Sequence, residues 1–527
     1  MAKKPTDWRK RFGGAKPAHV VMLHTDFAGV KAGNTMLISS PGDIAAYLDA
    51  VSFASVPPVL ADTPIVYDNV MTSTGRTGTF DNSASITTSS IFFEGEAVYD
   101  GNNVDISITR LALDEALEAA GATESQNQNT VASVLEEIYM GGEYGGEGSD
   151  FDTLLESLFG GDLTPDEVQD IFDNLGGAEH AQLQASTLGL STILNTFMSD
   201  RLDSTLPGLS GGKSMASFGL RDYADGTTGT TATDASPPVS AGNRGLNSGA
   251  SGASIWARGF GNWTTADGDA EATGYEQDSG GAAVGVDFAV NPNITIGAAG
   301  SWSSTDVSFD TLGDNAEIDT WQGGLYGSYG IGKSYVDATA SYASHDVSAE
   351  RLIDLPADDF IATSSYNATA WSVTGELGHI WRVGRVDVQP SVGLAYTSVS
   401  TDAFNETSAS NDFDLLVQGS DASSFASTLA VRASGQFLVG RTRVMPDLKL
   451  GWRHDFGDDR QAFTAAFEED PVTFEIVSSK TQVDAAVVNA GVTAAVSKSV
   501  EVFVDLNGLY GGEVATTNAS GGLRFTW

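Results

Sequence analysis

The side chains that most often carry chemistry stand in no catalytic or metal-binding spacing in this chain. None of the histidines belongs to an HExxH pair or to another metal-binding spacing. The serines are many, but none stands in the GxSxG sequence that exposes a nucleophile on a sharp turn. We therefore expect no catalytic residue, no metal and no cofactor. The histidines are His19, His24, His180, His345, His379 and His454.

Two short stretches resemble ligand-binding loops without meeting their requirements. Gly211-Gly212-Lys213-Ser214 ends like a phosphate-binding loop, but Pro207 takes the place of the first glycine. Asp267-Gly268-Asp269 could touch a divalent cation, although so short an acidic sequence is better interpreted as a solvated loop. The chain has no cysteine, which excludes disulfides and thiolate chemistry.

The chain is strongly acidic, with 27 Lys and Arg against 69 Asp and Glu and a formal net charge of −42. Nucleic acid binds to basic surfaces, so we expect no nucleic-acid partner. There is no run of about twenty apolar residues, so the sequence predicts no transmembrane helix. Under that restriction only a closed β-barrel could cross a bilayer.

Apolar and polar residues alternate at the end of the chain, as they do in a β-strand with one apolar and one polar face. Successive strand residues point to opposite faces, so Leu523, Phe525 and Trp527 share one face while Arg524 lies on the other. Such an apolar stripe needs either a partner sheet or lipid. A polar lumen and an apolar exterior are the pattern of a transmembrane β-barrel.

The same alternation recurs upstream, for example in 386–396 and 443–453, where Leu448, Leu450 and Trp452 oppose charged residues. The charges on the polar faces could pair with one another and hold a helix or linker in the pore, or they could only solvate it. The charged residues that we expect to face the lumen are Arg258, Glu376, Arg432, Asp447, Lys449, Arg453 and Arg524.

We predict about twelve strands between 254–264 and 518–527, among them long ones at 362–383, 415–439 and 472–496. The connections alternate between tight turns, such as Gly332-Lys333, and longer, mostly acidic loops. Bacterial barrels show this asymmetry, with short turns in the periplasm and long loops outside. A β-sandwich has no reason to alternate so regularly.

The residues before the barrel fall into four segments by composition. Residues 1–60 are unassigned, and 61–110 hold short β-like runs that fit the end of a β-solenoid or a small sheet. Residues 111–203 have helical periodicity, with a capping box at Thr164 and Glu167 and one last helix over about 179–203. Residues 204–252 are a Gly-, Ser- and Thr-rich linker, and 253–527 form the barrel domain. We expect the linker, rather than the apolar last helix, to fill the pore.

The beginning of the sequence does not match a secretory leader. Residues 1–11 are basic, but 12–25 contain no clean apolar region. Because the barrel pattern is far stronger than this absence, we expect a truncated or misassigned start.

Several stretches resemble the β-domain of the autotransporters, the type V secretion family. They include Trp256-Ala257-Arg258-Gly259-Phe260-Gly261-Asn262-Trp263, Leu325-Tyr326-Gly327-Ser328-Tyr329-Gly330, Gln389-Pro390-Ser391-Val392-Gly393-Leu394 and the terminal aromatic strand. The resemblance covers about 253–527. It implies a mainly β fold with a C-terminal twelve-stranded antiparallel barrel in the outer-membrane lipid, and a passenger segment in its lumen. It also implies that the barrel-assembly machinery recognises the terminal strand at Leu523, Phe525 and Trp527.

The sequence thus predicts a non-enzymatic outer-membrane barrel that secretes or anchors an N-terminal passenger at the cell surface. One alternative is a surface adhesin in which the barrel is only an anchor. The other is an autotransporter whose enzyme domain is missing from this sequence. A long repetitive solenoid upstream would favour the adhesin, whereas a hydrolase motif would favour the enzyme.

Overall fold

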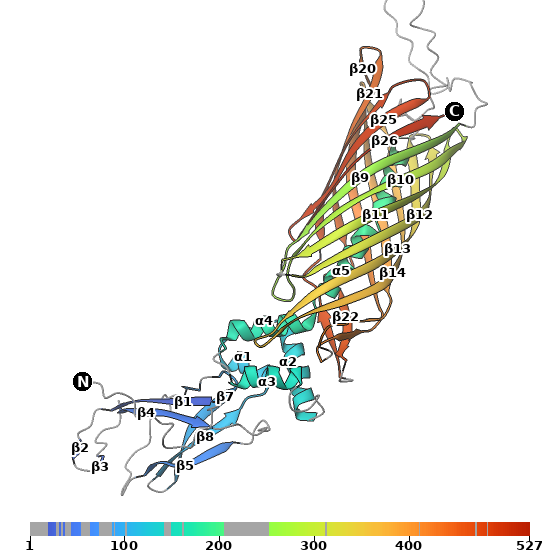
Figure 1. Ribbon diagram of the computed structural model, residues 1–527. Helices are drawn as coiled ribbons and strands as arrows, with labels where there is room; N and C mark the ends of the chain where they lie inside the picture. Colours follow the sequence, from blue (N-terminus) through green and yellow to red (C-terminus); the bar gives the residue numbers. More distant parts are fainter. Residues whose placement is uncertain are drawn as a thin grey trace, which may run out of the picture.

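The computed structural model describes most of the chain from residue 90 onward and isolated strands before it (Figure 1). The described residues are 19–27, 31–32, 35–36, 44–53, 64–72, 87–88, 90–100, 103–141, 149–160, 163–204, 252–310, 313–410, 412–468, 472–481 and 483–527. The basic residues 1–11 and almost all of the predicted linker at 204–252 lie outside them.

The C-terminal half is a closed antiparallel β-barrel of twelve long strands, as the alternation predicts. Each strand pairs with its neighbours in the chain, and β26 pairs with β9 to close the ring. The strands are β9 (Ala253–Ala266), β10 (Tyr275–Asn291), β11 (Ile294–Phe309), β12 (Asn315–Ile331), β13 (Ser334–Asp354), β14 (Asp359–His379) continued by β15 (Trp381–Val383), β16 (Val386–Thr401), β19 (Ser420–Gly435) continued by β20 (Phe437–Val439), β21 (Thr442–Asp455), β24 (Asp484–Ala495), β25 (Val500–Gly511) and β26 (Val514–Thr526).

The outside of the barrel is apolar, although water would disfavour such a surface. Side chains such as Leu325, Leu429 and Val504 are more than half exposed there. Aromatic residues border this surface: Trp302 and Trp321 form one neighbouring pair, and Trp371 and Tyr396 another. An apolar band bordered by aromatic rings is the signature of a barrel surface in contact with lipid.

Tight turns join the strands at one end of the barrel, and long connections join them at the other. Three of the tight turns contain a glycine at φ 65°, namely Gly332, Gly384 and Gly440. That backbone region strains other residues, so glycine is the natural choice there. In Figure 1, the C-terminus lies at the tight-turn end and helices α1–α4 lie at the opposite end.

The long connections fold into a second sheet, which the sequence did not predict. It consists of β17 (Phe404–Asn405), β18 (Leu415–Val417), β22 (Ala462–Phe467) and β23 (Thr473–Val477). The expectation of single strands at 415–439 and 472–496 was therefore wrong, because β18 and β23 leave the barrel wall and join this loop sheet.

Among the described residues before the barrel there are six helices: α1 (Leu113–Ala119), α2 (Gln126–Gly141), α3 (Asp150–Gly160), α4 (Pro165–Gly176), α5 (Glu179–Leu190) and α6 (Ile193–Asp203). The predicted capping box at Thr164 and Glu167 is present. The predicted single helix over 179–203 is broken into α5 and α6. None of the helices in the described ranges is long and apolar enough to cross a membrane.

The N-terminal strands form small sheets beside helices α1–α4. In one of them, β8 (Asn103–Arg110) lies between β5 (Ile65–Thr72) and β7 (Phe93–Asp100), and both pairings are antiparallel. A solenoid would stack its strands in parallel, so the small sheet is the better of the two interpretations. The other strands are β1 (His19–Phe27), β2 (Lys31–Ala32), β3 (Thr35–Met36), β4 (Ile44–Phe53) and β6 (Thr87–Thr88).

Candidate functional site

Helices α5 and α6 pass through the lumen of the barrel, surrounded by its wall (Figure 1). The expectation that the linker rather than the last helix fills the pore was wrong for the described residues. The prediction assumed a uniformly polar lumen, but large apolar side chains such as Trp256 also point inward and are buried. An inner wall of this mixed kind can accept a helix that is partly apolar.

Apolar contacts hold the middle of α6 against the wall. The ring of Phe197 lies edge-on to Phe260, with centroids 4.9 Å apart. Met198 lies over Gly324, where a Cβ atom would come within 2.7 Å of the Met198 Cε atom. Glycine at this wall position lets the helix approach closely.

Neutral hydrogen bonds hold α5 to the barrel wall. Ser186 donates to Gln277 Oε1 at 2.5 Å, and Gln184 Nε2 donates to Ser420 Oγ at 2.9 Å. These polar side chains are buried, so each would destabilise the structure if it had no partner. The helix is therefore matched to this wall along its length.

The wall also satisfies the backbone where α5 ends and α6 begins. Gln322 Nε2 donates to the Leu190 carbonyl at 2.7 Å, and Gln322 Oε1 accepts from the Leu194 amide at 3.0 Å. One side chain of β12 thus supplies both a donor and an acceptor to the broken helix. Helix ends carry unsatisfied backbone groups that need such partners.

Ser191 and His345 form a hydrogen-bonded pair at the same level. Ser191 Oγ lies 2.8 Å from His345 Nε2, and the other ring nitrogen lies 2.9 Å from Thr320 Oγ1. A nucleophilic serine needs an accessible hydroxyl and a carboxylate or equivalent group that orients its histidine. Ser191 is 1% exposed and also bonds to the Thr187 carbonyl, so the pair is a structural contact between helix and wall.

An ion pair holds the end of α6 at the tight-turn side. Arg201 donates to both carboxylate oxygens of Asp287 at 2.7 Å and to Ser254 at 2.8 Å. Ser254 and Tyr326 complete the shell around Asp287. Bidentate pairing gives this contact both strength and a defined geometry.

Most of the charged residues that the sequence assigns to the lumen lie together around the end of α6. Arg258 lies 3.4 Å from Asp200, and Arg432 lies 3.2 Å from Asp203, so both wall residues contact the helix. Arg432 also pairs with Asp447 in the wall. The remaining predicted residues pair within the wall as well: Lys449 with Glu376, Arg524 with Glu501 and, further toward the loops, Arg453 with Asp455.

At the loop end, the first turn of α5 is fixed by a buried charged cluster. Arg351 Nε and His180 Nε2 lie 3.0 and 2.8 Å from the same oxygen of Glu406. Burial alone would raise the pKa of Glu406, but the Arg351 charge and the bonds from His180 and Arg351 hold it well below its ordinary value. Burial and the nearby Asp314 carboxylate raise the pKa of Glu179 beside them.

The contacts between helix and wall were not predicted from the sequence, apart from the lumen charges. Gln322, Gln277 and His345 are single polar residues on inward faces, with no motif around them. One signal was present: α5 carries uncharged polar residues on every side, which suits a helix surrounded by a polar wall. Within the described residues, no group of His, Asp or Glu side chains could hold a metal ion.

The barrel domain matches a known family of protein domains. Residues 255–507 match the family model described as Autotransporter beta-domain. An extracellular serine protease of Serratia marcescens is 24% identical over 489 residues, which are 88% of this chain and 43% of the relative. Outer membrane protein A of Rickettsia conorii is 25% identical over 235 residues, 42% of this chain and 11% of the relative. The chain thus spans less than half the length of these relatives.

Two solved structures are similar in outline. The translocator domain of autotransporter NalP from Neisseria meningitidis aligns with a TM-score of 0.42 and 15% identity, over 53% of this chain and 90% of that one. The β-domain of the Bordetella autotransporter Brka aligns with a TM-score of 0.39 and 17% identity, over 52% and 98%. The family match runs from β9 into β25, the strands that surround α5 and α6, and the C-terminal domain therefore belongs to the autotransporter β-domain family of outer-membrane barrels.

Proposed function

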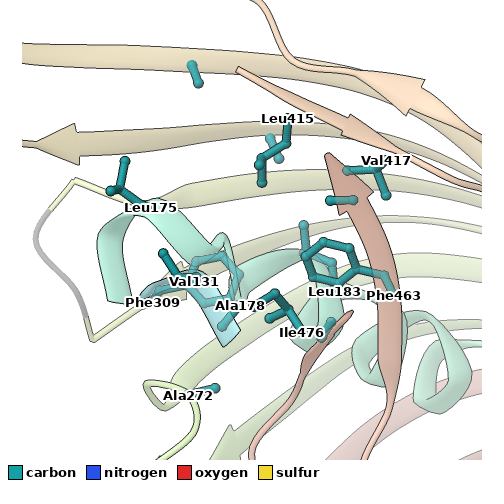
Figure 2. Close-up of a cluster of buried hydrophobic side chains, with 14 of the residues drawn as sticks. Val131, Leu175, Ala178, Leu183, Ala272, Phe309, Leu415, Val417, Phe463 and Ile476 are labelled. Carbon is teal, nitrogen blue, oxygen red and sulfur yellow. The ribbon is translucent and has the colours of Figure 1, made fainter. Parts of the chain in front are cut away.

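We propose that this barrel anchors its N-terminal part at the surface permanently, and that the chain described here performs no catalysis. The observation that carries the proposal is a hydrophobic core shared by helices α1–α4 and the loop sheet (Figure 2). Side chains from both sources meet there, including Val131 and Leu175 from the helices and Leu415, Phe463 and Ile476 from the loop sheet. We call helices α1–α4 the cap.

Polar contacts reinforce the junction between the cap and the loops. Asn127 of α2 donates to the carbonyls of Val477 and Glu271 and accepts from the Val477 amide at 2.9 Å. Phe151 of α3 stacks on Phe413, with ring centroids 6.2 Å apart. Releasing the cap would expose this core to water, so its construction favours retention over secretion.

The absence of catalysis is part of the proposal because two of the relatives are named as serine proteases. Their names describe proteins more than twice as long as the part that this chain matches. The hydrogen-bonded serine and histidine of the lumen, Ser191 and His345, are both buried, and within the described part of the chain neither is hydrogen-bonded to a carboxylate. Reaction of the folded chain with a fluorophosphonate probe, lost in Ser191→Ala, would overturn this part of the proposal.

The retention of the cap is tested by fractionating cells that express the full chain behind an export leader. An antibody against the cap should label intact cells, and the cap should sediment with the outer membrane on the same polypeptide as the barrel. A cap polypeptide free in the medium, with the barrel left in the membrane, would show that the chain secretes its passenger instead.

We also propose that the barrel-assembly machinery recognises the terminal strand through Leu523, Phe525 and Trp527. Leu523 and Phe525 lie on the lipid side of β26, and Trp527 follows the strand directly; the three side chains are 58%, 46% and 62% exposed. Phe525 and Trp527 stack with ring centroids 5.8 Å apart. Before the barrel closes, the backbone edge of β26 is unpaired and can bind a partner. The row of exposed apolar side chains on the same strand adds a surface that the partner can recognise.

A matched substitution separates recognition from simple loss of lipid contact. Phe525→Asn should abolish heat-modifiable barrel in outer-membrane fractions. Val504→Asn removes an apolar side chain that is 61% exposed on the same lipid face of β25, and it should leave substantial folded barrel. Equal losses in both variants would show that only hydrophobicity matters and would remove the case for a terminal signal.

A further inference from the structure

The tight-turn end of the barrel repeats one short sequence in four of its turns. In each case an apolar residue is followed by glycine or serine and then by a cation. The glycine adopts a positive φ in three of them. The four turns are Ile331-Gly332-Lys333, Val383-Gly384-Arg385, Val439-Gly440-Arg441 and Val496-Ser497-Lys498.

The apolar residues of these turns continue the lipid-facing surface of the barrel. They are 54%, 66%, 66% and 64% exposed, in chain order. Each lies two residues beyond an outward-facing residue of its strand; Tyr329, Trp381 and Phe437 are three of these and are themselves exposed. Because side chains alternate along a strand, the apolar residues stay on the lipid side, and each cation lies just past the apolar band.

The four cations, Lys333, Arg385, Arg441 and Lys498, are exposed and belong to no ion pair described for the structure. Two carboxylates that follow these turns in the chain are buried and paired with other cations: Asp387 pairs with Arg382, and Glu501 pairs with Arg524. The opposite end is acidic, with residues such as Asp310, Asp358 and Asp458 in its loops. The barrel is therefore charged asymmetrically along its axis.

We propose that these four basic turns bind anionic phospholipid headgroups in the leaflet at the tight-turn end, which is the periplasmic side of the outer membrane. The apolar residue of each turn stays in contact with acyl chains, and the cation reaches the phosphate layer. A cation near an anionic lipid surface gains roughly fivefold in association for each charge, and the gain is screened by salt. Lys and Arg thereby fix the depth of the barrel as well as its lipid neighbours.

The test measures which lipids surround the folded full-length protein in phosphatidylcholine vesicles. Spin-labelled phosphatidylglycerol should associate severalfold more strongly than spin-labelled phosphatidylcholine at low salt, and the preference should shrink at high salt. The neutral variant combines Lys333→Gln, Arg385→Gln, Arg441→Gln and Lys498→Gln. It should bring the ratio of the two association constants close to one.

A charge-preserving variant is the control, with Lys333→Arg, Arg385→Lys, Arg441→Lys and Lys498→Arg, and it should keep the preference. Heat-modifiable migration checks that each variant is folded. If the neutral variant fails to fold, the salt dependence of the unaltered protein decides the question. The proposal is overturned by an unaltered protein without lipid preference at low salt, by a neutral variant that keeps it, or by sedimentation with peptidoglycan in place of lipid selectivity.

Discussion

Gly324 is a wall residue at which the wall and the plug, helices α5 and α6, lie close together. A Cβ atom there would lie 2.7 Å from Met198 Cε and 2.8 Å from the Ala340 carbonyl oxygen. The methionine can move, but the backbone carbonyl cannot move far. Because Gly324 has no side chain, Met198 of α6 can pack directly against β12.

Gly324→Ala should therefore loosen the plug by about 1–3 kcal/mol, the usual cost of overpacking. The expected readout is more frequent channel opening in planar bilayers. Gly323→Ala is the matched control, because a Cβ atom at Gly323 would meet nothing within 4 Å. Identical opening frequencies in the two variants would contradict the close approach of helix and wall.

The buried carboxyls at the loop end of the barrel predict that the stability of the first turn of α5 depends on pH. Burial raises the pKa values of both Glu179 and Asp314 in the folded state, and the nearby Asp314 carboxylate raises the pKa of Glu179 further. The contribution of these two carboxyls to the stability of the folded state is fully present below the ordinary carboxyl pKa, about 4. It is lost as the pH rises through their raised folded-state pKa values. The first turn of α5 should consequently open more readily as the pH rises from about 4 past neutrality.

Hydrogen exchange of the amides in α5, corrected for its intrinsic pH dependence, measures this effect. Protection should decrease from pH 5 to pH 8 in the unaltered protein. Glu179→Gln should flatten that decrease, because the amide stays neutral. A decrease of the same size in the variant would assign the pH dependence to another group.

At the scale of the helices, the stability of α6 in the lumen depends on the ion pair between Arg201 and Asp287. Without the Arg201 side chain, the Asp287 carboxylate would remain buried without its partner cation, and breaking such a pair costs on the order of 3–5 kcal/mol. We expect Arg201→Gln to lower hydrogen-exchange protection across α6. Combining it with Asp287→Asn should recover most of the protection, since no unpaired charge is then left. Failure of the double variant to recover would mean that the packing of the Arg201 stem dominates.

The elements that were predicted from the sequence are those whose surroundings require a regular spacing of particular residue types along the chain. Lipid requires Leu448, Leu450 and Trp452 to be apolar on alternate positions, so the barrel strands could be found and their direction assigned. The capping box at Thr164 was found for a similar reason, because the backbone geometry of a helix start fixes its spacing.

The plug and the loop sheet have no such period. Neutral pairs such as Gln184 with Ser420 join residues that are 236 positions apart, and neither residue reveals its partner. The strands of the loop sheet are as short as two residues, and β18 and β23 lie next to barrel strands in the chain. A pattern of apolar residues cannot show at which residue a chain leaves the wall.

At the scale of the whole molecule, the cap and the barrel have different sources of stability. The barrel depends on its hydrogen-bonded ring and on lipid, whereas the cap depends on its shared core with the loops. Two cooperative units in one chain can unfold separately.

Asn127→Ala should destabilise the cap by roughly 1–3 kcal/mol, because the Val477 backbone groups lose their buried partners. The lower of two thermal transitions should shift while the heat-modifiable barrel stays unchanged. Asn129→Ala is the control on the exposed side of the same helix. A barrel that unfolds together with the cap would contradict this separation.

The closure of β26 on β9 has one more consequence. The chain passes through a complete ring, with a bulky domain on one side and the continuation of the same polypeptide into the ring wall on the other. The chain is therefore topologically trapped in the barrel. Dilution cannot release the outer domain from the ring; release requires cleavage of the chain in the lumen or separation of β26 from β9. For the same reason, the chain in the lumen must already be in place, or still be unfolded, when the final strand locks the ring.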